Sequence, residues 1–377
     1  MERLGRALPR LITKIQRYST IRTSRIRPLA SSAPLIIRPG TTTQAQGVVP
    51  LRDSNKRNEG NSRDGKSAGR WSRAIPGVLA SFSLFGIGAK KEDIDQLNVT
   101  VNSGRRAMDE QNYDEADRLF HEALKILETR KQNATIDEKE FIEKRTFVFD
   151  CLANLYFTKG DVRSGEALYK ETLKGLFASG YEQTDNAVIE ISVKLANVNA
   201  MQKRSAEAIA GYKYCIDAQQ RKFDSGITDD DTLALWGLCV DSYARFLVWT
   251  RDFAKSRELF EKALELSVKL RGSTHEQTLV ILNSLATVAV ETNDLDAAEG
   301  YLKRAIDCAE ENAYPDRAAF YVNLAGVYFQ KKQFDKALEL GKNALKIAIE
   351  VKDKESEEQA NLIVKMMSLR TAGKNPA

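Results

Sequence analysis

Few residues of this chain could perform catalysis or bind a metal ion, and those few are far apart in the sequence. The 377 residues include two histidines, His121 and His275, and four cysteines without a C-x-x-C pair. The sequence patterns of zinc proteases, serine hydrolases, P-loops and dinucleotide sites are not found in it. The acidic run at 229–231 stands at a predicted helix start, where carboxylates cap the helix and favour its dipole. We therefore expect a protein without catalytic, cofactor or metal-binding residues.

Charge divides the chain into two unlike parts. Residues 1–76 contain 16 basic and four acidic side chains, whereas the remainder contains 41 basic and 48 acidic ones. An acidic remainder argues against nucleic-acid binding by a folded basic face. The widely spaced cysteines argue against a disulfide framework, and we expect each to be a small buried side chain. They are Cys151, Cys215, Cys239 and Cys308.

The N-terminal segment has the pattern of a mitochondrial presequence. Between Met1 and Tyr18, leucine and isoleucine recur at helical spacing, and arginine and lysine occupy other positions. Residues 1–40 contain one acidic residue, Glu2, and an amphipathic, Arg-rich, acid-poor N-terminus is typical of import signals. The alternative is a basic tail that binds anionic surfaces. We predict a presequence over 1–40, with cleavage near Tyr18 and Ser19.

Two further segments precede the acidic part. Residues 41–73 are polar and lack periodicity, which predicts a disordered linker. Residues 74–89 carry no charge and are flanked by basic residues. As a helix, this segment would span about 24 Å, less than a bilayer core of about 30 Å. It is predicted to contact a membrane, either as a short anchor or at the interface, and the alternative is packing on the folded body.

A repeated pattern begins after residue 97 and predicts an all-α solenoid. Gln111–Leu124 and Lys332–Leu345 are its clearest copies, and four more lie between them. In each copy a small residue is predicted where two helices cross, because small side chains permit close approach. The small residues are Ala116, Gly165, Ala208, Ser256, Ala298 and Ala337. One hairpin cannot bury its apolar face alone, so the units must stack.

These motifs resemble the tetratricopeptide repeat, although their spacing of 39 to 49 residues exceeds the usual 34. We therefore expect extra turns on the helices or in the loops. The predicted repeat domain covers 90–371 and contains about six irregular hairpins. A capping helix is predicted over 353–370, with an apolar side that includes Leu362, Ile363, Met366 and Leu369.

A stacked solenoid has a concave groove, and in this repeat type the first helix of each hairpin lines it. Positions one residue after, or three before, the small residue of that helix are predicted to point inward. Asparagine there can both donate to and accept from a peptide backbone. The alternative is a solvated polar face. The candidates are Asp150, Asn154, Asn197, Asp241, Arg245 and Asn283. Phe157 and Phe329 are predicted either to form an apolar groove floor or to pack inside.

One block has a more individual character. The sequence D-N-A-V-I-E-I-S-V-K-L-A at 185–196, continuing to Ile216, resembles the third repeat of the mitochondrial tetratricopeptide repeat protein 19 family. The similarity covers about 90–370, and the N-terminal part matches only in kind. The resemblance implies a mitochondrial inner-membrane protein that associates with respiratory complex III. It also implies a role in clearing N-terminal fragments left when the Rieske iron–sulfur subunit is processed.

The resemblance brings no catalytic residue with it, so it implies binding of complex III subunits, the Rieske subunit or its fragments. Import by a presequence favours the matrix side of the inner membrane. The alternative function is a cytosolic peptide or cargo adaptor like the kinesin light chains, whose junctions the stretch 270–278 resembles. The basic N-terminal segment, residues 1–40, distinguishes the mitochondrial function from the cytosolic one, because a cytosolic adaptor needs no presequence. A protease is the third possibility, and no suitable nucleophile–base pair supports it.

Overall fold

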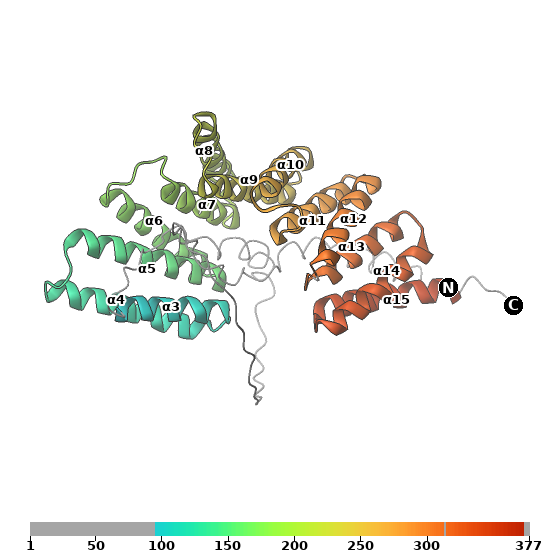
Figure 1. The fold of residues 1–377 in the computed structure, drawn as a ribbon, viewed down its shortest axis with the longest axis horizontal. Coiled ribbons are helices and arrows are strands. Elements are labelled where there is room, and N and C mark those ends of the chain that lie inside the picture. Colours follow the sequence, from blue (N-terminus) through green and yellow to red (C-terminus); the bar gives the residue numbers. More distant parts are fainter. Residues whose placement is uncertain (1–94, 313, 373–377) are drawn as a thin grey trace, which may run out of the picture.

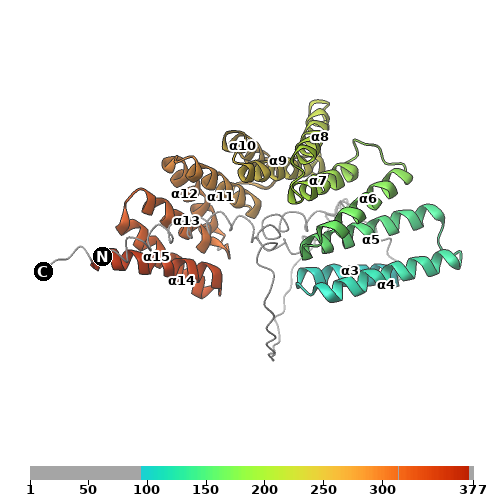
Figure 2. The same ribbon diagram turned by 180° about the vertical axis from the view of Figure 1, so that it is seen from behind.

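The computed structural model describes residues 95–312 and 314–372, and within them all regular structure is α-helical. The predicted segments 1–40, 41–73 and 74–89 lie outside the described residues. Figures 1 and 2 show the helices stacked side by side into an arched solenoid, with α3 and α15 at opposite ends of the array. The helices are α3 (Gln96–Asp109), α4 (Tyr113–Gln132), α5 (Glu138–Lys159), α6 (Val162–Ala178), α7 (Asn186–Met201), α8 (Ser205–Asp224), α9 (Asp230–Thr250), α10 (Phe253–Arg271), α11 (Glu276–Glu291), α12 (Leu295–Glu311), α13 (Arg317–Gln330), α14 (Phe334–Glu350) and α15 (Lys354–Ala372).

Six helical hairpins, α3/α4 to α13/α14, and a final helix confirm the predicted architecture. The small crossing residues are buried, and Ala116, Ala208 and Ala298 have no exposed surface. Contact is also close at Gly104, where a Cβ atom would lie 2.7 Å from the ring of Phe120. The long repeat spacing is explained by long helices: α5 has 22 residues and α9 has 21.

The two helices of each hairpin are joined by the same tight turn. One residue of the turn has a positive φ, the next residue is the N-cap, and the residue after that begins the following helix. Lys203 shows this geometry, with φ 61° and its N–H donating to the carbonyl of Ala200. Glycine provides it at Gly160, with φ 86°. Lys352 repeats the turn between α14 and α15, so α15 packs on α14 as a hairpin partner would.

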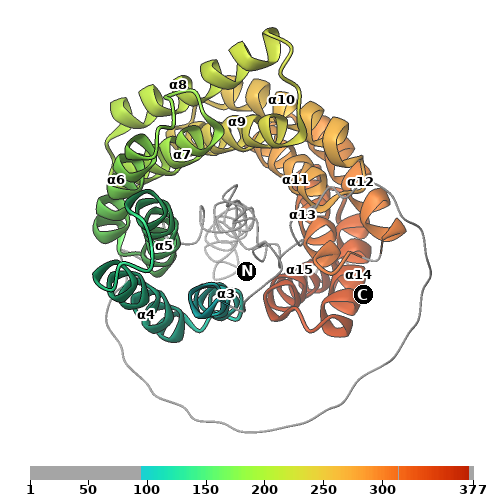
Figure 3. The same cartoon turned by 60° about the vertical axis from the view of Figure 1, so that its left-hand side comes forward.

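The first helices of the hairpins lie on the inner side of the curve. In Figure 3, α5, α7, α9, α11 and α13 form an inner row, and α6, α8, α10 and α12 lie outside them. This arrangement agrees with the prediction that the first helix of each hairpin faces the concave side. Polar residues on these helices are therefore the place to look for a binding site.

Candidate functional site

At α5 and α7 the inner helices enclose a charged network. Lys194, on α7, lies with its Nζ 2.8 Å from Oδ1 of Asp150 on α5 and 2.9 Å from Oε1 of Glu190, one turn earlier on α7. All three side chains are fully buried. Asn154 donates to Asp150 over 3.2 Å and accepts a hydrogen bond of 2.7 Å from the hydroxyl of Tyr169. The network joins two successive repeats.

The electrostatics of this network favour its charged form. Burial by itself lowers the pKa of Lys194, but the carboxylates of Asp150 and Glu190 oppose this effect and raise the pKa above its ordinary value. Burial raises the pKa of the Tyr169 hydroxyl, which therefore stays protonated as a donor. The ammonium group of Lys194 pairs with the carboxylates of Asp150 and Glu190. Asp150 and Asn154 therefore both have hydrogen-bonding partners inside the fold.

Three further candidates lie in the middle of the array, on α7 and α9. Asn197 is 1% exposed and accepts a hydrogen bond of 2.6 Å from the hydroxyl of Tyr212. Asp241 is also 1% exposed and accepts two hydrogen bonds from Arg245, one turn later on α9, at 2.7 and 3.1 Å. The fork geometry uses both carboxylate oxygens. All three residues lie on the inner helices. Asp241 and Arg245 pair with each other, whereas the Nδ2 of Asn197 is buried without an acceptor among the described residues.

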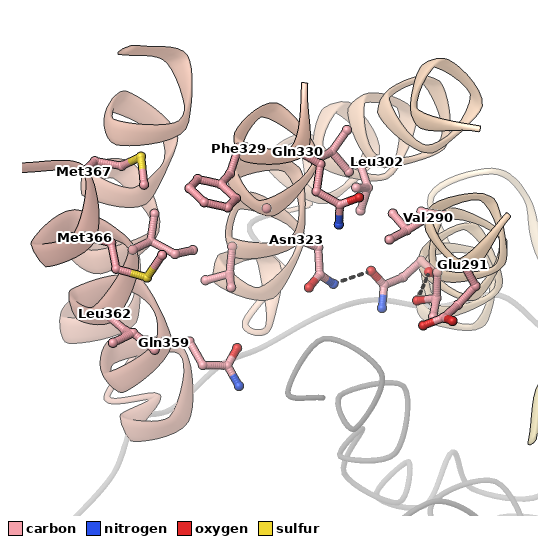
Figure 4. A pocket seen from close by; sticks show the side chains of 17 residues that line it. Val290, Glu291, Leu302, Asn323, Phe329, Gln330, Gln359, Leu362, Met366 and Met367 are labelled. Atoms are coloured by element: carbon pink, nitrogen blue, oxygen red, sulfur yellow. Dashed lines mark hydrogen bonds between the residues drawn. The ribbon is translucent and has the colours of Figure 1, made fainter. Parts of the chain in front are cut away.

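Asn283 is the candidate that lines an open pocket. The pocket lies between α11, α13 and α15 at the C-terminal end of the inner row, as Figure 4 shows. Its lining is mainly apolar, with four side-chain amides and one carboxylate. The lining residues are Asn283, Ala286, Thr287, Val290, Glu291, Leu302, Val322, Asn323, Gly326, Val327, Phe329, Gln330, Gln359, Leu362, Ile363, Met366 and Met367.

The amides of this pocket are partly unused. Asn323 donates to Oδ1 of Asn283 over 2.7 Å, which links α13 to α11. Oδ1 of Asn323 is buried and accepts no hydrogen bond from the described residues. Asn283 is 5% exposed and Gln359 is 8% exposed, so both amides are held in place by their surroundings. Such groups can donate to and accept from an extended peptide backbone.

The pocket was only partly predictable from sequence. Phe329 lines the pocket, whereas Phe157 is buried against Tyr169 with ring centroids 6.5 Å apart. Of the two alternatives predicted for these residues, Phe329 thus forms an apolar floor and Phe157 packs inside. The capping helix contributes four apolar side chains to the pocket lining, of which Ile363 and Met367 are buried and Leu362 and Met366 are partly exposed. The sequence did not indicate three of the pocket amides, because they become neighbours only when α15 packs on the end of the array. These are Asn323, Gln330 and Gln359.

Residues considered first for chemistry have structural roles here. His275 caps α11, since its Nδ1 accepts from the N–H of Gln277 at 3.1 Å, and Asp229 caps α9 in the same way through Thr232. Three cysteines are buried as expected, but Cys308 on α12 is only half-buried, packed against the core. Among the described residues, no group of three His, Cys, Asp or Glu side chains could hold a metal ion.

The comparisons with known proteins agree with this geometry. Two family models, each described as Tetratricopeptide repeat, match residues 233–311 and 283–350. The human protein "Tetratricopeptide repeat protein 19, mitochondrial" is 33% identical over 276 residues, which span 69% of this chain and 70% of the human one. The chain belongs to the tetratricopeptide repeat protein 19 family. Its mouse relative is 33% identical over 62% of this chain and 64% of the mouse protein, and the Drosophila melanogaster homolog is 23% identical over 74% of each.

Solved structures support the fold alone. A signal-transduction ATPase with a tetratricopeptide repeat sensor, from Pyrococcus horikoshii, has a TM-score of 0.53 at 14% identity over 80% of this chain and 41% of that one. BtubC from P. vanneervenii has a TM-score of 0.50 at 19% identity over 68% of this chain and 92% of that one. Solenoids of this kind are typically binding scaffolds.

The block that suggested the tetratricopeptide repeat protein 19 family also has a structural explanation. Glu190 and Lys194 fall inside it, on a helix whose other buried residues are mostly apolar. Their partner Asp150 lies in the preceding hairpin. The family-like block thus contains two of the three charges of the buried network. Relatives named mitochondrial place this chain among mitochondrial tetratricopeptide repeat proteins.

Proposed function

We propose that this protein is a non-enzymatic binding protein of the mitochondrial inner membrane that supports respiratory complex III. In this role it promotes clearance of the N-terminal fragments left by processing of the Rieske iron–sulfur subunit. The observation that carries the proposal is membership of the tetratricopeptide repeat protein 19 family, with one-third identity to the human relative over 69% of the chain. The solenoid supports it, because an inner face can hold an extended polypeptide.

The proposed partners are complex III subunits, including the Rieske subunit or its fragments. The pocket lining combines the side-chain amides of asparagine and glutamine residues with an apolar floor. This combination suits a peptide better than a small polar substrate. The protein would hold a fragment and present it to a protease, without cleaving it. The peptide-contact role of the six inner-face candidates stays a prediction, and the geometry favours Asn283 among them because it alone lines the pocket.

The proposed location is the matrix side of the inner membrane, with residues 1–40 as the import signal and 74–89 as the membrane contact. None of the helices in the described part of the chain is long and apolar enough to cross a bilayer. Carbonate extraction of purified mitochondria separates integral from peripheral attachment. Deletion of 74–89 should release the protein from the membrane fraction, and unchanged association would place the contact elsewhere.

The deciding experiment is deletion of the gene, with measurement of Rieske-derived fragments and complex III activity. The proposal predicts that fragments accumulate and activity falls, and that the full chain restores both. Normal fragment levels together with normal activity would overturn the function. A rescue that depends on residues 1–40 would support a mitochondrial role over that of a cytosolic adaptor.

A further inference from the structure

The pocket between α11, α13 and α15 combines three kinds of surface. Val290, Val322 and Phe329 form an apolar side on α11 and α13, and Met366 faces them from α15. Figure 4 shows Phe329 and Met366 opposite each other, with Asn323 between α11 and α15. Methionine is flexible and polarisable, so this floor can adapt to side chains of different shape. The pocket is therefore suited to a flexible or variable apolar group.

Hydrogen-bonding groups lie beside the apolar floor. Asn323 places an amide in the pocket lining, and its Oδ1 is buried without a hydrogen-bond donor among the described residues. Gln330 and Gln359 present further amides from α13 and α15. Donors and acceptors on both sides of an apolar floor match a polypeptide in extended form, whose backbone alternates N–H and C=O.

The charged lining of the pocket is acidic only. None of its lining residues is lysine or arginine, and Glu291 is acidic. Glu291 is 26% exposed and lies 3.8 Å from the guanidinium of Arg251, whose side chain is 72% exposed. A pair this exposed and this long contributes little, so Glu291 can exchange its partner for another cation. An occupant with a positive charge next to an apolar residue would complement both features.

We propose that this pocket is a docking site for a basic, apolar, extended peptide of the kind cleaved from imported proteins. An import signal is Arg-rich, acid-poor and amphipathic, which matches an apolar floor beside Glu291. An apolar side chain of the peptide enters between Phe329 and Met366, and a neighbouring arginine pairs with Glu291. The inference rests on the proposed function, because it names where and by what chemistry a Rieske-derived fragment is held.

Gly326 offers a way to close the pocket without disturbing the fold. It lies on α13 in the pocket lining, and a Cβ atom at this position would meet nothing within 4 Å. Gly326→Leu therefore fills the pocket space and also raises helix propensity. Gly300 on α12 is exposed and equally open at its Cβ position, but it does not line the pocket. Gly300→Leu is the matched control.

The binding experiment uses the purified full chain and a fluorescein-labelled peptide with the sequence of the Rieske N-terminal fragment. Fluorescence anisotropy gives the affinity. Gly326→Leu should weaken binding by about tenfold or more, since an apolar side chain loses its site. Gly300→Leu should leave the affinity unchanged. Equal affinities for both variants and the unmodified chain would overturn the pocket as the docking site.

A second arm tests charge. Glu291→Gln should weaken binding by about threefold at low salt, and the difference should shrink at high salt. Glu258→Gln, at an exposed carboxylate on the outer helix α10, is the control. A peptide with its arginines replaced by glutamine should lose the dependence on Glu291. A dependence on Glu291 that persists with the neutral peptide would overturn the arginine pairing.

Competing occupants are distinguished by one further probe. A peptide of residues 74–89 is uncharged, and it should bind the pocket more weakly than the basic peptide. If it binds more tightly and Gly326→Leu abolishes that binding, the occupant is the chain's own apolar segment and the inference fails. The two proposals also fail separately. Tight peptide binding unaffected by Gly326→Leu rejects the pocket and keeps the function, whereas pocket binding with normal fragment levels after gene deletion rejects the function.

Discussion

The two ends of the inner face use polar residues in opposite ways. At α5 and α7, Asp150, Glu190 and Lys194 are fully buried and pair with one another. At α11, α13 and α15, Asn283 and Asn323 share one hydrogen bond and leave the Oδ1 acceptor of Asn323 unused beside an open pocket. Both groups lie on inner helices. The two groups therefore differ in how much of their hydrogen-bonding capacity the fold itself uses.

The difference follows from what packs next to each group. Between α5 and α7, consecutive hairpins enclose the charges, and a buried ion group of this kind can fix the register of the two repeats. At the other end, a single helix, α15, closes the array and leaves space beside α13. The same repeat geometry thus produces a closed, charged contact between α5 and α7 and a pocket beside α15.

The largest expected effect comes from breaking the buried network. Lys194→Ala leaves two carboxylates buried without their cation and should lower the free energy of unfolding by about 3–5 kcal/mol. Lys213→Ala, at an exposed position on α8, should change it by less than about 0.5 kcal/mol. Urea denaturation measures both. A loss below about 1 kcal/mol for Lys194→Ala would contradict the closed network.

Glycine positions give the next largest contrast. A Cβ atom at Gly175 would lie 1.9 Å from Oγ1 of Thr146, so Gly175→Ala should destabilise the protein by about 1–3 kcal/mol through overpacking. Gly326→Leu, in the open pocket, should instead be neutral or stabilise by up to about 1 kcal/mol. Thermal unfolding ranks the two variants. If Gly326→Leu unfolded as readily as Gly175→Ala, the pocket would be a packed region.

On the outer helices α6 and α12, a glutamate forms an ion pair with a basic residue of the next hairpin. Glu166 on α6 and Glu299 on α12 each follow the small crossing residue and bond to the next hairpin, through Arg204 and Lys331 respectively. Burial alone would raise both pKa values, but hydrogen bonds from Lys170 and Lys303, and from the next hairpin, lower each to about 2.

A lowered carboxyl pKa stabilises the folded state above the ordinary value near 4.5, and this stability is lost as the pH falls through about 2. Glu166→Gln and Glu299→Gln should each cost about 1–2 kcal/mol at pH 7, after allowance for screening of their exposed partners. The cost should shrink steadily between pH 4.5 and 2. A cost that is independent of pH would show that the carboxylate charge does not stabilise these joints.

The smallest expected effect tests the turns that the two ends share. Lys203 has a positive φ and is exposed, so Lys203→Gly should relieve local strain and raise the free energy of unfolding by about 0.5 kcal/mol. Lys213→Gly, in the middle of helix α8, should instead destabilise by about 1 kcal/mol. The same sign for both substitutions would contradict the left-handed turn.

The sequence predicted the repeats well because each signal is local. Residues such as Ala116, Ala208 and Ala298 mark helix crossings within single hairpins, and the structure buries all three. The six groove candidates all lie on first helices of hairpins, but their partners could not be read from spacing. Asp150 pairs with Lys194 across 44 positions of the chain, and only the packing of two hairpins brings them together.

The pocket was harder to predict for the same physical reason. Asn323 joins Asn283 across 40 positions, and Gln359 belongs to a capping helix whose side chains were expected to form one apolar face. In the structure that helix serves both the core and the pocket, because Ile363 and Met367 are buried and also line the pocket together with Leu362 and Met366. Gly326, a half-buried glycine inside α13, was not identified from the sequence.

Photo-cross-linking tests most directly whether the open end of the inner face is the binding end. The probe is the Rieske N-terminal peptide with a photoreactive leucine at each apolar position in turn, mixed with the full chain and mapped by mass spectrometry. We expect labelling of α13 and α15 around Phe329 and Met366, with loss of labelling in Gly326→Leu. Labelling concentrated on α5 and α7 around Asn154, and unchanged in Gly326→Leu, would contradict this expectation.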